Sequence, residues 1–246
     1  MNKKRGYLQI SFAWLFAIIA GAVILFLAIY GVTKLISTEE DILNAKTGKE
    51  IGVLLNPLET GFETGKVTSL TMPVESRIYA RCKIGGNFGK QTISVSQQSF
   101  NKWTETNLEI DFENKYIFAE IPVEGKKFYL FSKPFKMPFK IADLIYMAPS
   151  SEKYCFLGLE DSGAMELEDI KDELVSLNQG NILIENCSEQ EEIIKVCFSS
   201  GKDCYINVNY GRGIFQKKGE TMYFETDALM YGAIFIDSSE NYECNV

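Results

Sequence analysis

The feature that most constrains this chain is an uninterrupted apolar run near its N-terminus. Residues Phe12–Val32 contain no charged residue and no proline. As a helix rising about 1.5 Å per residue, this run covers about 30 Å, the thickness of the hydrocarbon core of a bilayer. A helix is also the only single segment that satisfies its own backbone hydrogen bonds in lipid. The run therefore predicts one transmembrane helix over residues 12–32.

The flanks of the run favour a retained anchor with a defined orientation. A cleaved secretory signal has an apolar region of about 7–15 residues and a small-residue cleavage site, whereas this run is longer and leads into Thr33-Lys34. Three basic residues, Lys3, Lys4 and Arg5, precede it, against Lys34 alone just after it. This bias places the N-terminus, residues 1–11, in the cytoplasm. The remaining chain is predicted outside, held at the cell membrane by a single pass.

The N-terminal flank also carries a motif. Lys4-Arg5-Gly6 is followed by Gln9-Ile10-Ser11 directly before the apolar run. This arrangement resembles the class III signal of archaeal type IV pilin-like proteins, which implies cleavage after Gly6 and bundling of the helix with other copies. The sequence departs from that pattern at Ala13, which stands where the pilin glutamate would be. An ordinary uncleaved anchor is the alternative.

Beyond the span, apolar residues recur at helical spacing as far as Leu55. They predict a stalk or packing helix over residues 33–56 that continues the transmembrane helix. Ser37-Thr38-Glu39-Glu40 has the form of a capping box, so a break at Ile36 and a fresh helix from Ser37 is the alternative.

The composition of residues 57–150 predicts a β-rich region. Short segments rich in β-branched and aromatic residues alternate with turn residues, which indicates strands. Gly85 to Lys90 is interpreted as a hairpin turn, since it lacks the spacing of a phosphate-binding loop. Seven strands at this spacing predict a small antiparallel barrel or sandwich. The predicted strands are Lys66–Met72, Arg77–Cys82, Gln91–Ser96, Leu108–Phe112, Tyr116–Ile121, Lys127–Phe131 and Lys140–Ala148.

Residues 151–246 read as a smaller, acidic, mixed α/β region, which makes the whole chain α+β. A helix over Ala164–Leu177 has apolar residues at core spacing and acidic residues mainly on its other face. Leu229–Ile236 is apolar throughout, and its periodicity fits a buried strand or a short helix. The predicted strands are Tyr154–Leu159, Asn181–Glu185, Ile193–Phe198, Tyr205–Asn209 and Met222–Glu225.

All six cysteines fall in the part predicted to be exported. An even number of cysteines in an exported domain predicts up to three disulfides. Cys197 and Cys204 are the favoured pair, because Ser199-Ser200-Gly201 can turn the chain between two strands. The other four cysteines allow three pairings, which the sequence leaves open. They are Cys82, Cys155, Cys187 and Cys244.

The stretch from Lys126 to Lys140 combines basic and aromatic residues without an acid. Such a composition can dock on a lipid surface, with rings at the interface and amines at phosphates. The alternative is a core strand followed by a corner at Pro134 and Pro138, with its lysines in water. The candidate membrane-interface residues are Lys126, Lys127, Phe128, Tyr129, Lys133, Phe135 and Lys136.

The residue types argue against familiar catalytic chemistry. The chain has no histidine, and no serine or lysine nucleophile motif stands out. Scattered thiols without histidine do not predict a metal site, and no cofactor motif is present. All 33 acidic residues lie after position 38, with their excess in residues 151–246, which argues against nucleic acid as a partner. The sequence therefore predicts no enzyme, no catalytic residue and no cofactor.

Further segments, such as residues 56–63, 100–103, 113–118 and 125–134, resemble uncharacterised single-pass membrane proteins of archaea. That resemblance implies no activity and no site residues. Two functions follow as expectations. The first is a non-enzymatic surface structural or assembly component of pilin-like plan, with the bilayer and other copies as partners. The second is a tethered binding or accessory domain that acts as a monomer at the cell envelope.

Overall fold

The structure is a computed structural model that describes residues 12–55, 67–82, 90–99, 102–136, 138–160, 165–185, 187, 192–198 and 204–236. It consists of two compact units, Met1–Ala45 and Lys46–Val246.

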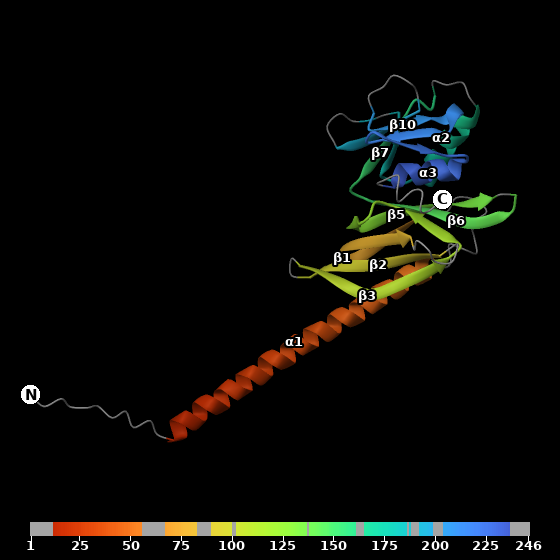
Figure 1. Ribbon diagram of the computed structural model, residues 1–246. Helices are drawn as coiled ribbons and strands as arrows, with labels where there is room; N and C mark the ends of the chain where they lie inside the picture. The colour runs from red at the N-terminus through yellow and green to blue at the C-terminus, as the bar shows by residue number, and fades with distance from the viewer. Residues whose placement is uncertain are drawn as a thin grey trace, which may run out of the picture. The chain divides into compact units, whose positions relative to one another are not determined.

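The N-terminal apolar run is helical throughout. Helix α1, Phe12–Leu55, continues through Ser37, as the predicted continuation of the span requires, and the alternative break at Ile36 is absent (Figure 1). Its segment Phe12–Leu35 has a mean hydropathy of 2.8, and none of it is buried inside the protein. A helix that is apolar around its whole circumference is stable in contact with lipid or with other apolar helices. The structure therefore supports a membrane anchor here.

The first sheet of the larger unit, called the N-terminal sheet, holds six strands in the order β3-β2-β1-β5-β6-β4. All neighbours are antiparallel except β4, which runs parallel to β6. The strands are β1, Val67–Cys82; β2, Lys90–Ser99; β3, Lys102–Glu113; β4, Lys115–Phe118; β5, Val123–Lys136; and β6, Lys140–Pro149.

Of the two predicted forms, barrel or sandwich, a closed barrel is not formed, since the described backbone ladder ends at β3 on one side and at β4 on the other. The sheet instead curls around its own core and meets itself through one side chain. The carboxamide of the buried Gln91 on β2 accepts from the backbone N–H of Ile117 on β4 and donates to the carbonyl of Ile117. This side chain makes two hydrogen bonds to the backbone of Ile117, of the kind that a neighbouring strand would make.

The core inside this curl draws apolar residues from every strand of the N-terminal sheet. Alternation along each strand places these side chains on one face. Its fully buried members include Ile78, Ile93, Phe128 and Ile145.

The second sheet, called the C-terminal sheet, has the order β12-β11-β10-β9-β7-β8. Strands β8, β7, β9 and β10 are parallel, and β11 and β12 add as antiparallel strands. Helix α2, Met165–Leu177, connects β7 to β8. The strands are β7, Lys153–Leu157; β8, Ile182–Ile184; β9, Ile193–Cys197; β10, Ile206–Asn209; β11, Ile214–Lys217; and β12, Glu220–Tyr223.

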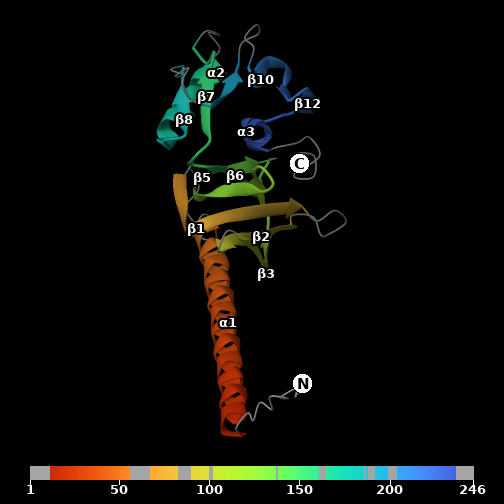
Figure 2. The ribbon, with the colours of Figure 1, turned by 90° about the vertical axis from the view of Figure 1, so that its left-hand side faces the viewer.

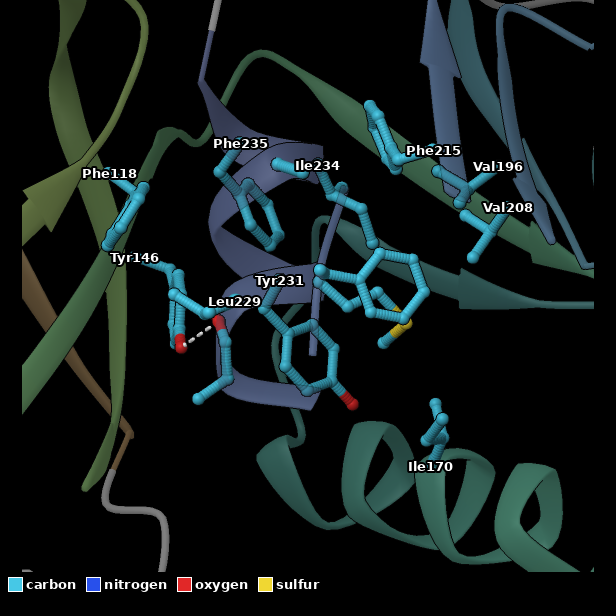
Figure 3. Close-up of a cluster of buried hydrophobic side chains, with 14 of the residues drawn as sticks. Phe118, Tyr146, Ile170, Val196, Val208, Phe215, Leu229, Tyr231, Ile234 and Phe235 are labelled. Atoms are coloured by element: carbon cyan, nitrogen blue, oxygen red, sulfur yellow. Dashed lines mark hydrogen bonds between the residues drawn. The ribbon is translucent and has the colours of Figure 1, made fainter. Parts of the chain in front are cut away.

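Helix α3, Asp227–Phe235, lies between the two sheets (Figures 1 and 2). One side contacts Phe118 and Tyr146 of the N-terminal sheet, and the other faces Val208 and Phe215 of the C-terminal sheet (Figure 3). Every residue of α3 after Asp227 is buried. A helix packed on both sides is apolar all round, which explains why periodicity alone did not identify it.

One glycine permits the close approach of α3 to the N-terminal sheet. A Cβ on Gly232 would lie 2.7 Å from the ring of Phe118, which is itself fully buried. The helix begins with Thr226, whose hydroxyl accepts from the backbone N–H of Leu229. Helix α2 joins the same core through its apolar stripe, Leu167, Ile170, Leu174 and Leu177, at the predicted spacing.

Several predicted boundaries need correction. Lys66–Met72 and Arg77–Cys82 form one strand, β1, because an irregularity between Thr71 and Ser76 accommodates Pro73 without ending the ladder. The predicted corner at Pro134 is also wrong, since Pro134 pairs with Asp143 and β5 continues to Lys136. Strand β11 was not predicted. Most of the predicted turn 85–90 lies outside the described residues.

Candidate functional site

The two faces of the C-terminal sheet differ sharply. Residues such as Phe156, Val196 and Phe215 point to the helices and belong to the shared core. The alternating residues point to the other face, where Cys155 of β7 is joined to Cys187 and Cys197 of β9 is joined to Cys204. We call this second face the disulfide face.

The strand order explains why disulfides occur on this face. The chain moves one way along the sheet from β7 to β8, through α2, and then returns past β7 to β9 and β10. Since parallel crossovers are right-handed, residues that follow β8 or precede β10 are expected on the opposite face from α2. Cys187 follows β8 and Cys204 precedes β10, and each is tied to the strand below it. Cys197 and Cys204 are the pair that the sequence favoured. The side chain of Cys82 and all of Cys244 lie outside the described residues.

The candidate membrane-interface residues do not share one surface. Phe128 is fully buried and Phe135 packs against the shared core, so these rings face protein. Lys126 and Lys136 are exposed, whereas Lys127 and Tyr129 are half-buried and lie together, the ammonium 4.8 Å from the ring centroid.

Lys133, the remaining member of that set, belongs to an internal network. Its ammonium donates to the carboxylate of Glu173 on α2 at 2.6 Å, and the hydroxyl of Tyr231 on α3 donates to the same oxygen. The ammonium also lies 4.9 Å from the centroid of the Tyr231 ring. Burial, followed by the adjacent Glu173 charge, raises the pKa of Tyr231 well above its ordinary value, so the hydroxyl remains a donor. Lys133 therefore links the N-terminal sheet to both helices.

This placement predicts that the lysines do not mediate lipid binding. In a fragment of residues 46–246, replacing Lys126, Lys127 and Lys136 with glutamine should leave sedimentation with anionic vesicles unchanged, because Phe128 and Phe135 face protein and only Phe139 in this stretch is an exposed ring. Were the lysines used, each would contribute about 1 kcal/mol, so the triple variant would bind on the order of 100-fold more weakly. A loss of that size would establish a lipid-docking surface.

Parallel sheets bind ligands at the carboxyl ends of their strands, where the chain direction along the sheet reverses. In the C-terminal sheet this point lies beside the end of β7. The backbone N–H groups of Gly158 and Leu159 donate there to one carboxylate oxygen of Glu185, at 2.7 and 2.9 Å. Glu185 follows β8, the neighbouring strand. In doubly wound nucleotide-binding folds, backbone N–H groups at this place bind a phosphate. Here the carboxylate of Glu185 already occupies them.

The opposite end of the C-terminal sheet holds a cluster of titratable groups. The buried Tyr154 donates its hydroxyl to Glu152 at 3.1 Å. Burial, and next the nearby Glu120, raise the pKa of Glu152 above 4.5. The ammonium of Lys217, which is 2% exposed, donates to the carbonyls of Ile234 and Ile236 at the C-terminal end of α3. That end carries the negative pole of the helix dipole, which stabilises the buried cation.

The Glu152 carboxyl predicts a specific pH dependence of stability. Because the pKa of Glu152 is higher in the folded state, the folded protein binds this proton more tightly than the unfolded chain does. Protonated Glu152 therefore contributes its full stabilisation of the fold below the unfolded pKa of about 4.5. That stabilisation is lost as the pH rises through the folded pKa. Glu152→Gln keeps an acceptor for Tyr154 and removes this loss. We therefore expect the melting temperature of the variant, relative to wild type, to rise from pH 4.5 to pH 7.

Thermal unfolding of both proteins at the two pH values measures this effect. Glu168→Gln, at an exposed position of α2, is the control for removing one negative charge. A difference between wild type and Glu152→Gln that stays constant from pH 4.5 to pH 7 would contradict the assignment.

A pocket of about 350 Å³ opens next to this cluster, beside the Cys197–Cys204 disulfide. Its walls come from the segment before β10, from β10 and β11, and from the turn after β11. The lining residues are Cys204, Tyr205, Asn207, Gln216, Lys217, Lys218 and Gly219.

Sequence reasoning missed these groups. Glu120, Glu152 and Lys217 are far apart along the chain and meet only because α3 holds the two sheets against each other. Lys218-Gly219, between two strands, has the form of a tight hairpin turn and is the one local signal that could have drawn attention to the pocket.

The described residues contain no cluster of three or more cysteine, aspartate or glutamate side chains arranged to hold a metal ion. Comparisons with protein-family models, with curated proteins and with solved structures find no match.

Proposed function

We propose that this protein is a membrane-anchored surface component that acts through assembly with other copies rather than as an enzyme. The observation that carries the proposal is the apolar segment Phe12–Leu35, none of which is covered by the rest of the protein. Such a surface requires lipid, and it also offers a contact for identical helices in the bilayer. The basic flank Lys3-Lys4-Arg5 supports an orientation with the N-terminus in the cytoplasm and the larger unit outside.

The disulfides support an exported location for the larger unit. Cys155–Cys187 and Cys197–Cys204 join segments of the same sheet, and such bonds persist in oxidising compartments. The internal use of Glu173, Glu185 and Lys217 in structural contacts supports a role for the unit as a rigid displayed body.

The span contains a row of small residues that suits helix association. Ala13, Ala17 and Gly21 recur every four residues, and no side chain lies within 4 Å of a Cβ placed on Gly21. Small residues at this spacing let two helices approach closely in a membrane. This row defines a test of assembly.

The test uses the full-length protein in native membranes. Carbonate extraction should leave it in the membrane, protease added outside intact cells should digest the larger unit, and chemical cross-linking should yield oligomers. Gly21→Ile should reduce cross-linked oligomers several-fold, and Gly31→Ile, which also meets open space, is the matched control. N-terminal sequencing in the same material decides whether Gly6 is a processing site.

A monomer in cross-linking, with an intact N-terminus and an external larger unit, would replace this proposal with the second candidate, a tethered binding domain. The pocket beside Cys204 is the observation that favours that candidate.

A further inference from the structure

We propose that the pocket beside the Cys197–Cys204 disulfide binds a small hydroxyl-rich carboxylate of the size of an acidic monosaccharide. The inference does not depend on whether the protein assembles. It follows from the volume of the pocket, from the polar groups that line it, and from one lysine held at its rim.

The position of that lysine is fixed by the backbone. Lys217 pairs with Glu220, so Lys218 and Gly219 alone form the turn between β11 and β12. Both have positive φ, 52° and 84°, as the type I′ hairpin turn requires. The ammonium of Lys218 lies 5.7 Å from the centroid of the Tyr205 ring. Lys218 is therefore held over the pocket by a rigid turn and an aromatic contact.

Lys218 forms no ion pair with a described residue, and its charge interacts with the Glu152 carboxylate only at longer range. Among the described residues, no carboxylate oxygen lies within ion-pair distance of its ammonium, although the C-terminal region is acidic overall. Its neighbour Lys217, by contrast, is buried and bound to two carbonyls. An exposed cation at the rim of a concave site favours a ligand with a negative charge.

The floor of the pocket supplies hydrogen-bonding groups. Asn207 of β10 stands directly opposite Gln216 of β11, so both carboxamides lie on the disulfide face. The Nδ2 of Asn207 donates to the carbonyl of Cys204 at 3.1 Å, which leaves its Oδ1 to accept from a ligand hydroxyl. The exposed Gln216 offers both a donor and an acceptor. Two carboxamides side by side suit a ligand with several hydroxyl groups.

The volume of the pocket and the aromatic ring of Tyr205 at its wall also fit a monosaccharide. A volume of about 350 Å³ is at the lower end of the range for small-molecule sites. The ring of Tyr205, 43% exposed, can contact the C–H face of a sugar ring while its hydroxyl reaches water. A carboxylate on that sugar would pair with Lys218, and its hydroxyls with Asn207 and Gln216.

The experiment measures ligand binding by saturation-transfer NMR on the full-length protein in detergent micelles. Glucuronate is the probe, glucose tests for the hydroxyl groups alone, and acetate tests for the carboxylate alone. We expect saturable glucuronate binding, with glucose and acetate each bound at least about tenfold more weakly, since a charge-assisted hydrogen bond contributes on the order of 1.5–3 kcal/mol.

Variants tie the signal to the pocket. Lys218→Gln should weaken glucuronate binding at least about tenfold, and Gln216→Ala, which removes a neutral hydrogen bond, about fivefold. Both side chains are exposed, and an unchanged melting temperature verifies that the variants are folded. Lys195→Gln, an exposed lysine of β9 on the same face but not in the pocket lining, is the matched control and should bind as wild type does. No saturable binding of glucuronate, equal binding of all three probes, or full binding by Lys218→Gln and Gln216→Ala would each overturn the proposal.

Discussion

Replacing Tyr146 with alanine is expected to lower the free energy of unfolding of the larger unit by about 3–5 kcal/mol, the cost of removing a large aromatic side chain from a core. Tyr146 is fully buried on β6, with its ring centroid 4.6 Å from that of Phe131 and 5.8 Å from that of Tyr231. Its hydroxyl donates to the carbonyl of Ala228 at 2.6 Å, which ties β6 to the first turn of α3 (Figure 3). A loss of this size is a large share of the stability of a typical domain.

Two further variants separate the causes. Tyr146→Phe keeps the ring and removes only the hydrogen bond to the Ala228 carbonyl, so it should cost about 1–2 kcal/mol. Tyr223→Ala, at a position 69% exposed, should change stability by less than about 0.5 kcal/mol. Denaturant unfolding followed by circular dichroism measures all three. If Tyr146→Ala cost less than about 1 kcal/mol, or if the two sheets unfolded in separate transitions, the shared core would not be one cooperative unit.

Removing the two disulfides should destabilise the protein unequally. Cys155 and Cys187 are 32 residues apart, whereas Cys197 and Cys204 are 7 apart. In the chain-entropy model, closing the longer loop stabilises the fold by about 3.7 kcal/mol and closing the shorter loop by about 2.4 kcal/mol. The double alanine variant of the Cys155–Cys187 pair should therefore be the less stable of the two.

The comparison is well controlled, because each pair joins one buried cysteine of a strand to one half-buried cysteine of a connection. Equal losses, or a larger loss for Cys197 and Cys204, would contradict the entropic account. Intact-mass analysis after alkylation without reductant tests the location of the domain in the same material. Six alkylated thiols in natively produced protein would reverse the orientation inferred from the basic N-terminal flank.

Features that depend on neighbours along the chain were predictable. The span 12–32 is visible as an unbroken apolar run, and α1 is helical there. The helical spacing of apolar residues predicted the buried face of α2, and Ile170 and Leu174 on that face are buried. The pair Cys197–Cys204 is close in sequence, so a short turn was enough to suggest it.

Features that depend on which distant segments meet were not predictable in this way. Strand β4 lies parallel to β6, and the carboxamide of Gln91 replaces the ladder that would have closed a barrel. Lys133 belongs to a basic and aromatic stretch, yet its ammonium is bound to Glu173, 40 residues away. The alternation of apolar and polar residues along a strand predicts which side chains share a face of the sheet. It does not predict which element packs on that face.

The anchor, the α+β class and the apolar face of α2 could be predicted, because each results from the spacing of residues within one element. The folded chain was needed to show that 227–235 is a helix buried between two sheets, that Glu152 lies near Glu120 and Lys217, and that Asn207, Gln216 and Lys218 line one pocket. These groups meet because strands far apart in the chain bury apolar surface together. That free energy depends on which surfaces fit together, and a pattern read along one segment contains no information about its partner.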